Sequence, residues 1–286
     1  MSKKFKTNVS DTNKDFSVTE ILRDRHDIET TPGHKCSCPK CERETFSAAK
    51  DDKSGRCWHP SCGFIISKKL EANPIFRETQ LTLFEIEKKS KAALQSEGGR
   101  VPLEYLQVAR RVHPLVINAL PVGAVPVDLN INKLFSKTID EFNKAIRNAK
   151  GQDKIDQLEK DLAEFESKIQ NLQERLSENP NYLIFIFKNA AGEICQLRFR
   201  GPHTKAFTSW KVGSEAGLFG AETGSSHLTE DKNIVVVEGE FNLLSLQSVL
   251  IRRCEKLGIE TNFVFAAAIG SSSNPDFKNQ IGRAHV

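Results

Sequence analysis

The chain has 286 residues, of which 38% are apolar and 27% charged, and its formal net charge is +4 at pH 7. This length favours two domains, and the apolar share excludes a wholly disordered chain. No apolar run approaches the ~20 residues of a membrane-spanning helix, and the basic start lacks the apolar stretch of a secretory signal. We therefore expect no membrane partner. The small positive charge permits a nucleic-acid partner without arguing for one.

Seven cysteines, five of them between residues 36 and 62, indicate a metal site in a reducing compartment and not a disulfide scaffold. Cys38-Pro-Lys-Cys41 has the Cys-x-x-Cys spacing, and His59-Pro-Ser-Cys62 repeats its x-Pro-x-Cys form. Tetrahedral Zn²⁺ takes four sulfur or nitrogen ligands at such spacings. The pattern predicts Zn²⁺ held by Cys38, Cys41, His59 and Cys62, with Cys57 as the alternative to His59.

The cysteines lie in a predicted zinc β-ribbon domain at residues 16–69, which begins with a short helix and follows a disordered tail at 1–15. Lysines and arginines alternate there with Phe46, Trp58 and Phe64. Basic groups can follow phosphates and aromatic rings can stack on bases. We interpret Phe46 and Phe64 as ribbon core and leave Trp58 open between core and base stacking.

Helical patterns dominate the next part of the chain. Residues 70–100 have partial helical periodicity, which predicts a helical linker, and residues 101–127 predict small helices followed by a strand. Between 132 and 178 apolar residues recur every three or four positions on both sides of Gly151. This heptad seam predicts an inserted antiparallel coiled-coil hairpin, with a parallel coiled-coil dimer as the alternative.

From residue 182 the apolar pattern becomes that of strands. Residues 182–187 and 194–200 predict a β-hairpin. The apolar run at 233–237, the helical pattern at 241–254 and the apolar run at 261–267 predict a βαβ unit with parallel strands. The fold class is therefore α+β and multidomain.

Two acids, Glu238 and Glu240, flank Gly239 at the end of the first strand of this βαβ unit. Ligands of open α/β sheets bind beyond the carboxyl ends of the strands, and carboxylates there can hold Mg²⁺ for phosphoryl transfer. The same acids could instead interact with the positive N-terminus of the following helix. The residues alone leave both interpretations open.

The order of these parts resembles the Toprim-type DNA primases of bacteria and their phages, the DnaG type. The motif CPKC…HPSCG is similar to the family's zinc motif, and VVVEGEFNLLSL at 235–246 is similar to its first Toprim motif. Tyr105-Leu106 and VGAVP at 122–126 resemble the start of the family's polymerase core. The segment 192–200, followed by basic residues and Gly217-Leu-Phe-Gly220, resembles its basic subdomain. The resemblance skips the helical hairpin.

The resemblance implies a DNA-directed RNA polymerase of the primosome, which synthesises RNA primers on single-stranded DNA for DNA replication. It implies Glu238 as the catalytic acid, Glu240 as a possible second acid, and Arg200, Lys205 and Lys211 as template-binding or nucleotide-binding residues. The implied cofactors are Zn²⁺ in the ribbon and Mg²⁺ or Mn²⁺ in the complete Toprim domain. The implied partners are single-stranded DNA, NTPs and a replicative helicase, in the cytoplasm of a bacterium or a phage-infected host.

Two other interpretations stay open. One is a non-catalytic zinc-ribbon and Toprim DNA-binding protein of a phage or mobile element. The other is a different Toprim enzyme, such as a nuclease or a topoisomerase. A later Asp-x-Asp pair would distinguish a primase from the non-catalytic protein.

The resemblance divides the core into an N-terminal subdomain at 101–131 and 182–222 and a partial Toprim domain at 223–280. This sequence has Asn242 where the family has Asp, and the family's later Asp-x-Asp pair does not follow. The codons ATC GGA AGA GCA CAC GTC, a common sequencing-adapter string, would encode residues 281–286. We therefore expect an incomplete core with an adapter-derived tail, inactive by itself.

Overall fold

The structure, a computed structural model, describes residues 16–259 and 264–267 apart from 60–61, 63, 68–69, 71, 180, 190–191, 204–206, 213–216 and 221–233. The predicted tails at 1–15 and 281–286 lie outside the described residues. The chain divides into two compact units, Met1–Glu71 and Ala72–Val286. Within the described ranges, no helix combines the length and apolar character needed to cross a bilayer.

Among its described residues, the first unit contains a small antiparallel sheet and the helix α1 (Val18–His26). Its strands β1 (Lys35–Cys36), β2 (Phe46–Ala48), β3 (Ser54–Cys57) and β4 (Ile65–Ser67) pair in the order β1-β2-β3-β4. Ser17 caps helix α1 by accepting a hydrogen bond from the Glu20 N–H. Phe46 is fully buried, and the partly buried Phe64 packs against it, so both belong to the ribbon core.

The second unit contains a larger antiparallel sheet of strands β5 (Val122–Ala124), β6 (Leu183–Lys188), β7 (Ile194–Arg200) and β8 (Phe207–Lys211), in that order. The pairing of β6 with β7 confirms the predicted hairpin. Neighbouring residues of a strand point to opposite faces, so Phe185 and Phe187 join one core cluster while Ile184 and Ile186 join another. Both faces of the sheet are therefore covered by helices.

Helix α3 (Pro74–Leu94) contributes to both clusters, through Leu83 and Ile86 in one and Leu94 in the other. The Gln80 side chain also donates to the backbone carbonyl of Ile194 and accepts from its N–H, both at 2.8 Å. These contacts place α3 in the second unit.

Helix α3 approaches strand β5 most closely at Gly123. A Cβ atom built there would lie 2.6 Å from both the carbonyl carbon and the hydroxyl oxygen of Ser90. We expect Gly123→Ala to lower the free energy of unfolding by about 1–3 kcal/mol, because the backbone of α3 must shift. Urea denaturation measures this. Gly98→Ala is the control, since the nearest atom there belongs to the exposed side chain of Val127. Equal stability losses in the two variants would contradict the interpretation.

Small helices precede β5, as predicted. They are the 3-10 helix η1 (Glu97–Gly99), α4 (Arg100–Glu104), the π-helical turn η2 (Tyr105–Ala109) and α5 (Pro114–Ala119). Arg111, just after the π-helical turn, has a left-handed backbone with φ of 52°. A π-helical turn and a non-glycine residue at positive φ often mark functional segments. Arg110 lies between these two features.

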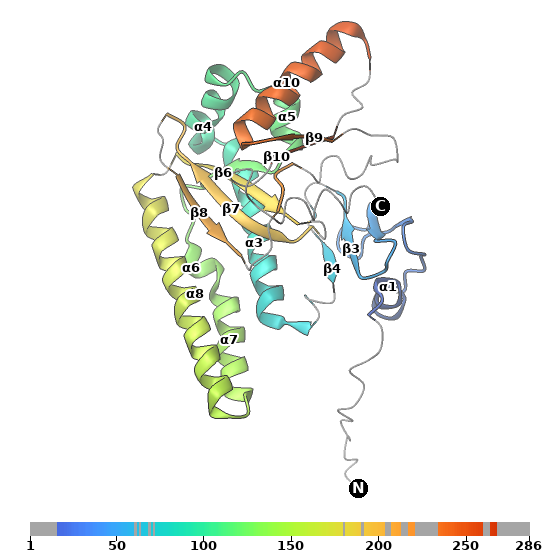
Figure 1. Cartoon of the computed structure of the whole chain (residues 1–286), viewed down its shortest axis with the longest axis vertical. Helices are drawn as coiled ribbons and strands as arrows, with labels where there is room; N and C mark the ends of the chain where they lie inside the picture. Colours follow the sequence, from blue (N-terminus) through green and yellow to red (C-terminus); the bar gives the residue numbers. More distant parts are fainter. Residues whose placement is uncertain are drawn as a thin grey trace. The chain divides into compact units, whose positions relative to one another are not determined.

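The inserted segment forms α6 (Ile131–Leu134), α7 (Ser136–Asn148) and α8 (Gln152–Glu178). Helices α7 and α8 run side by side and join through a short turn (Figure 1), with Gly151 at φ 95°. The rings of Phe142 in α7 and Phe165 in α8 lie 5.6 Å apart. Further along α8, Ile169 and Leu172 are buried in the same cluster as Trp210 of β8. The heptad seam therefore packs partly on α7 and partly against the sheet.

Strands β9 (Ile234–Val237) and β10 (Val264–Ala267) form a parallel pair, and helix α10 (Glu240–Leu257) connects them along the chain. This arrangement confirms the predicted βαβ unit. Leu243 and Leu244 of α10 are fully buried in the cluster that contains Phe185 and Phe187. The end of β9 is consequently held close to the antiparallel sheet.

Candidate functional sites

Four cysteine thiols converge in the first unit. The Sγ atoms of Cys38, Cys41, Cys57 and Cys62 all lie within 4.8 Å of one another. The Sγ atoms of Cys38 and Cys62 are 3.6 Å apart, as are those of Cys41 and Cys57. Zn–S bonds of about 2.3 Å place the sulfurs of a tetrahedral site about 3.8 Å apart, whereas a disulfide needs about 2.0 Å. The four cysteines could therefore bind Zn²⁺.

Backbone amides orient two of these sulfur atoms. The N–H of Lys40 donates to Cys38 Sγ and the N–H of His59 donates to Cys57 Sγ, both at 3.4 Å. Each donor follows its cysteine by two residues, so the two turns have the same local geometry. Hydrogen bonds of this kind orient metal ligands and stabilise the thiolate form.

The environment shifts the cysteine pKa values in opposite directions. Burial raises the pKa of the Cys57 and Cys62 thiols above the ordinary value. A hydrogen bond from the Arg43 backbone N–H lowers the pKa of Cys41 to about 7. Buried thiolates need a nearby cation to compensate for lost hydration, and a bound metal ion supplies that charge.

His59 lies outside this group of four, and its Nε2 atom contacts Nη1 of Arg43. Cys57 pairs with Phe46 in the register of β2 and β3, which brings its sulfur beside that of Cys41. The structure therefore places Cys57, the alternative, in the group in place of His59. The x-Pro-x-Cys repeat, on which the preference for His59 rests, carries no information about strand register.

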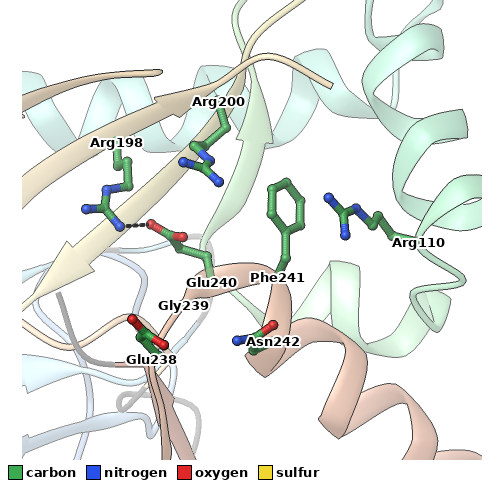
Figure 2. Close-up of a pocket in the computed structure, with 8 residues that line it drawn as sticks. All are labelled: Arg110, Arg198, Arg200, Glu238, Gly239, Glu240, Phe241 and Asn242. Atoms are coloured by element: carbon green, nitrogen blue, oxygen red, sulfur yellow. Dashed lines mark hydrogen bonds and ion pairs between the residues drawn. The ribbon is translucent and has the colours of Figure 1, made fainter. Parts of the chain in front are cut away.

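The second unit contains a pocket of about 370 Å³ at the end of β9 (Figure 2). Strand β7 supplies two of its arginines. Glu238, just after β9, and Glu240, the first residue of α10, are its acids. The lining residues are Arg110, Arg198, Arg200, Glu238, Gly239, Glu240, Phe241 and Asn242. Three arginines and two acids therefore meet at the carboxyl end of a parallel strand.

The two acids of this pocket differ in environment. Glu238 is exposed, whereas the Glu240 side chain is only 4% exposed and forms an ion pair with Nη1 of Arg198. Figure 2 shows the Glu238 carboxylate apart from this pair. Since Arg198 neutralises Glu240, Glu238 is the exposed carboxylate of the pocket.

Aromatic rings hold two of the arginines. The guanidinium carbon of Arg110 lies 4.6 Å from the ring centre of Phe241, and that of Arg200 lies 5.8 Å from the same centre. Nε of Arg110 also donates to the Tyr105 hydroxyl at 2.8 Å. Guanidinium groups arranged in this way suit phosphate oxygens, which they can bind with two parallel hydrogen bonds.

The pocket brings together three residues that the sequence singled out, namely Arg200, Glu238 and Glu240. Lys211 does not line it, because it pairs with Gln196 at the opposite end of β7 from Arg200. Lys205 lies outside the described residues.

Sequence reasoning missed two of the pocket arginines. The spacing of Arg198 and Arg200 could have identified Arg198, since residues two apart share one face of a strand. Arg110 has no such local signal, because it reaches the pocket from a distant part of the chain.

No family model and no curated protein matches this sequence. Solved structures do match. A DnaG primase catalytic domain bound to ssDNA has 14% identity and a TM-score of 0.49, and the match covers 74% of this chain and 59% of that chain. The E. coli primase catalytic core has 13% identity and a TM-score of 0.43, and the match covers 73% of this chain and 59% of that chain.

The zinc-binding and RNA polymerase domains of the Aquifex aeolicus primase also match, at 13% identity and a TM-score of 0.44. That match covers 92% of this chain and 66% of the other. The chain thus spans about three fifths of the catalytic-domain structures it matches. Each of these three solved structures is of a primase.

Proposed function

We propose that this chain is part of a DnaG-type DNA primase, a nucleotidyltransferase that makes RNA primers on single-stranded DNA. The pocket carries this proposal, because it joins Glu238 at the end of a parallel strand to three arginines. A carboxylate at such a position suits a divalent cation, and arginines suit the phosphates of template and nucleotide. The zinc and Toprim motifs support the same assignment.

In this proposal the exposed acid of the pocket and two of its arginines have distinct tasks. Glu238 holds the divalent ion, since its exposed carboxylate offers hard oxygen ligands. Mg²⁺ or Mn²⁺, when bound, stabilises the negative charge that develops during phosphoryl transfer. Arg200 and Arg110 bind phosphate oxygens and orient the nucleotide, while their contacts with Phe241 limit their movement.

In this proposal the zinc ribbon is the part of the chain that binds the single-stranded DNA template. Its four cysteines hold Zn²⁺ as a structural ion. The Arg56 guanidinium lies 3.6 Å from the ring centre of Trp58, and Trp58 Nε1 donates to Ser47 Oγ at 2.7 Å. A half-exposed ring held in this way could stack on a base. A replicative helicase is the expected partner, in a bacterium or a phage-infected cell.

Two binding measurements on this chain test the proposal. We expect a fluorescent oligothymidine of about 15 nucleotides to bind with an affinity that falls as salt rises. We also expect ATP to bind only when Mn²⁺ or Mg²⁺ is present, as measured by calorimetry. Nucleotide binding that ignores the metal ion, or no DNA binding at low salt, would refute the proposed function.

One observation favours the non-catalytic DNA-binding alternative, namely the neutralisation of Glu240 by Arg198, which leaves fewer charged metal ligands. This alternative predicts salt-dependent DNA binding without metal-dependent ATP binding. The same two measurements therefore separate the two functions.

A further inference from the structure

The ion pair between Arg198 and Glu240 joins strand β7 to the first residue of helix α10. A role in metal binding does not by itself explain this location. Glu240 is the first residue of α10, and Glu238 lies two residues before it. Both partners are largely buried, with side-chain exposures of 15% for Arg198 and 4% for Glu240. Removal of either side chain of a buried ion pair is costly, because the remaining charged group then has neither its opposite charge nor its hydrogen-bond partner.

Arg198 lies on a central strand of the antiparallel sheet. Strand β7 is paired on both sides, with Phe185 and Ser209 opposite Arg198 in the two registers. The Arg198 guanidinium carbon also lies 5.8 Å from the ring centre of the fully buried Phe187. The guanidinium group is therefore a fixed point against which α10 can be placed.

Neighbouring side chains do not pack closely around Gly239, the residue just before α10. A Cβ atom built on Gly239 would meet no atom within 4 Å, so neighbouring side chains do not clamp the chain there. The ion pair follows immediately, at Glu240. The position of this ion pair thus determines where α10 begins. It also determines where Glu238 lies, because Glu238 is only two residues before Glu240.

We propose that Arg198 and Glu240 are a positioning pair that fixes the start of α10 and aims Glu238 into the pocket, and that Glu240 is not itself a metal ligand. The role of Glu238 in this statement rests on the proposed function. The placement of α10 rests on the contacts alone.

Conservative and non-conservative variants distinguish positioning from ligation. Glu240→Gln keeps a hydrogen-bond acceptor for Arg198 but removes the charge, so affinity for Mn²⁺·ATP should stay within about threefold of the unsubstituted chain. Glu240→Ala and Arg198→Ala should each reduce it by about tenfold or more. If Glu240 were a ligand, Glu240→Gln would lose as much affinity as Glu240→Ala, and Arg198→Ala would not weaken binding. That outcome would overturn the proposal.

The pair of Lys188 and Glu87 provides a matched control. It also joins a strand to a helix, at 2.9 Å, with similar side-chain exposures of 14% and 9%, but it does not line the pocket. Lys188→Ala should lower stability without changing Mn²⁺·ATP affinity. An equal loss of affinity in Lys188→Ala would show that general destabilisation explains the effect, and would refute a specific positioning role.

Amide hydrogen exchange tests the positioning claim even if the chain binds no Mn²⁺·ATP. The Leu243 N–H donates to the Gly239 carbonyl at 3.1 Å in the first turn of α10. Its exchange should become about tenfold faster in Arg198→Ala and Glu240→Ala but not in Glu240→Gln or Lys188→Ala. Unchanged exchange in Arg198→Ala would refute the positioning pair. Absence of metal-dependent ATP binding in the unsubstituted chain would refute the proposed function instead.

Discussion

Cys62→Ser is expected to abolish zinc binding and to unfold the first unit. The strands of that unit have between 2 and 4 residues, and its core is one small cluster. The hydrophobic core of so small a domain gives only marginal stability, whereas structural zinc contributes about 10–16 kcal/mol of apparent binding energy in small domains. Zinc content by atomic emission and proteolysis mapped onto residues 16–67 measure both effects.

Three further variants decide the ligand set. Cys57→Ser should lose zinc as Cys62→Ser does, whereas His59→Ala should retain it, because His59 contacts Arg43 and lies outside the group of four. Cys36→Ser is the matched control, since this partly buried cysteine also lies outside the group. Zinc loss in His59→Ala with retention in Cys57→Ser would instead support the ligand set that the sequence favours.

Glu238→Gln is expected to reduce affinity for Mn²⁺·ATP by at least about tenfold, because an amide replaces the charged oxygen ligand that a hard cation prefers. The side chain is exposed, so the substitution should change the free energy of unfolding by no more than about 0.5 kcal/mol. Calorimetric titration measures the first quantity and urea denaturation the second. Affinity for single-stranded DNA should change little, since arginines supply the phosphate contacts.

Glu255→Gln is the control for this substitution. Glu255 lies near the other end of α10, where its Oε1 is 3.5 Å from Nε2 of His113, outside the pocket. It should leave Mn²⁺·ATP affinity unchanged. If both variants lower the affinity equally, the loss reflects the net charge of the chain, and Glu238 has no specific role.

Local patterns predicted the elements well where the backbone period itself carries the information. The hairpin of β6 and β7 and the parallel pair of β9 and β10 follow from apolar runs and from the helix between the latter two strands. Helix α3 was predicted as a helix, but its place in the second unit was not. Its Gln80 bonds to Ile194, a residue far along the chain, and no local pattern contains that contact.

For the candidate sites too, local patterns predicted some features, while others depend on contacts between distant residues. The cysteine spacing pointed to a metal site and the strand-end motif pointed to Glu238, because both signals lie within a few consecutive residues. The choice between Cys57 and His59 depends on the register of β2 and β3, which local spacing does not contain.

The sequence by itself determined that this chain carries a cluster of cysteines with the spacing of metal ligands and an acid at the end of an apolar strand. Only the tertiary structure decided that Arg198 neutralises Glu240 and that Arg110 joins the pocket. The physical reason is the separation along the chain of the residues that interact. Periodicity and ligand spacing reflect local backbone geometry, whereas the partner of a buried charge depends on which distant segments pack together.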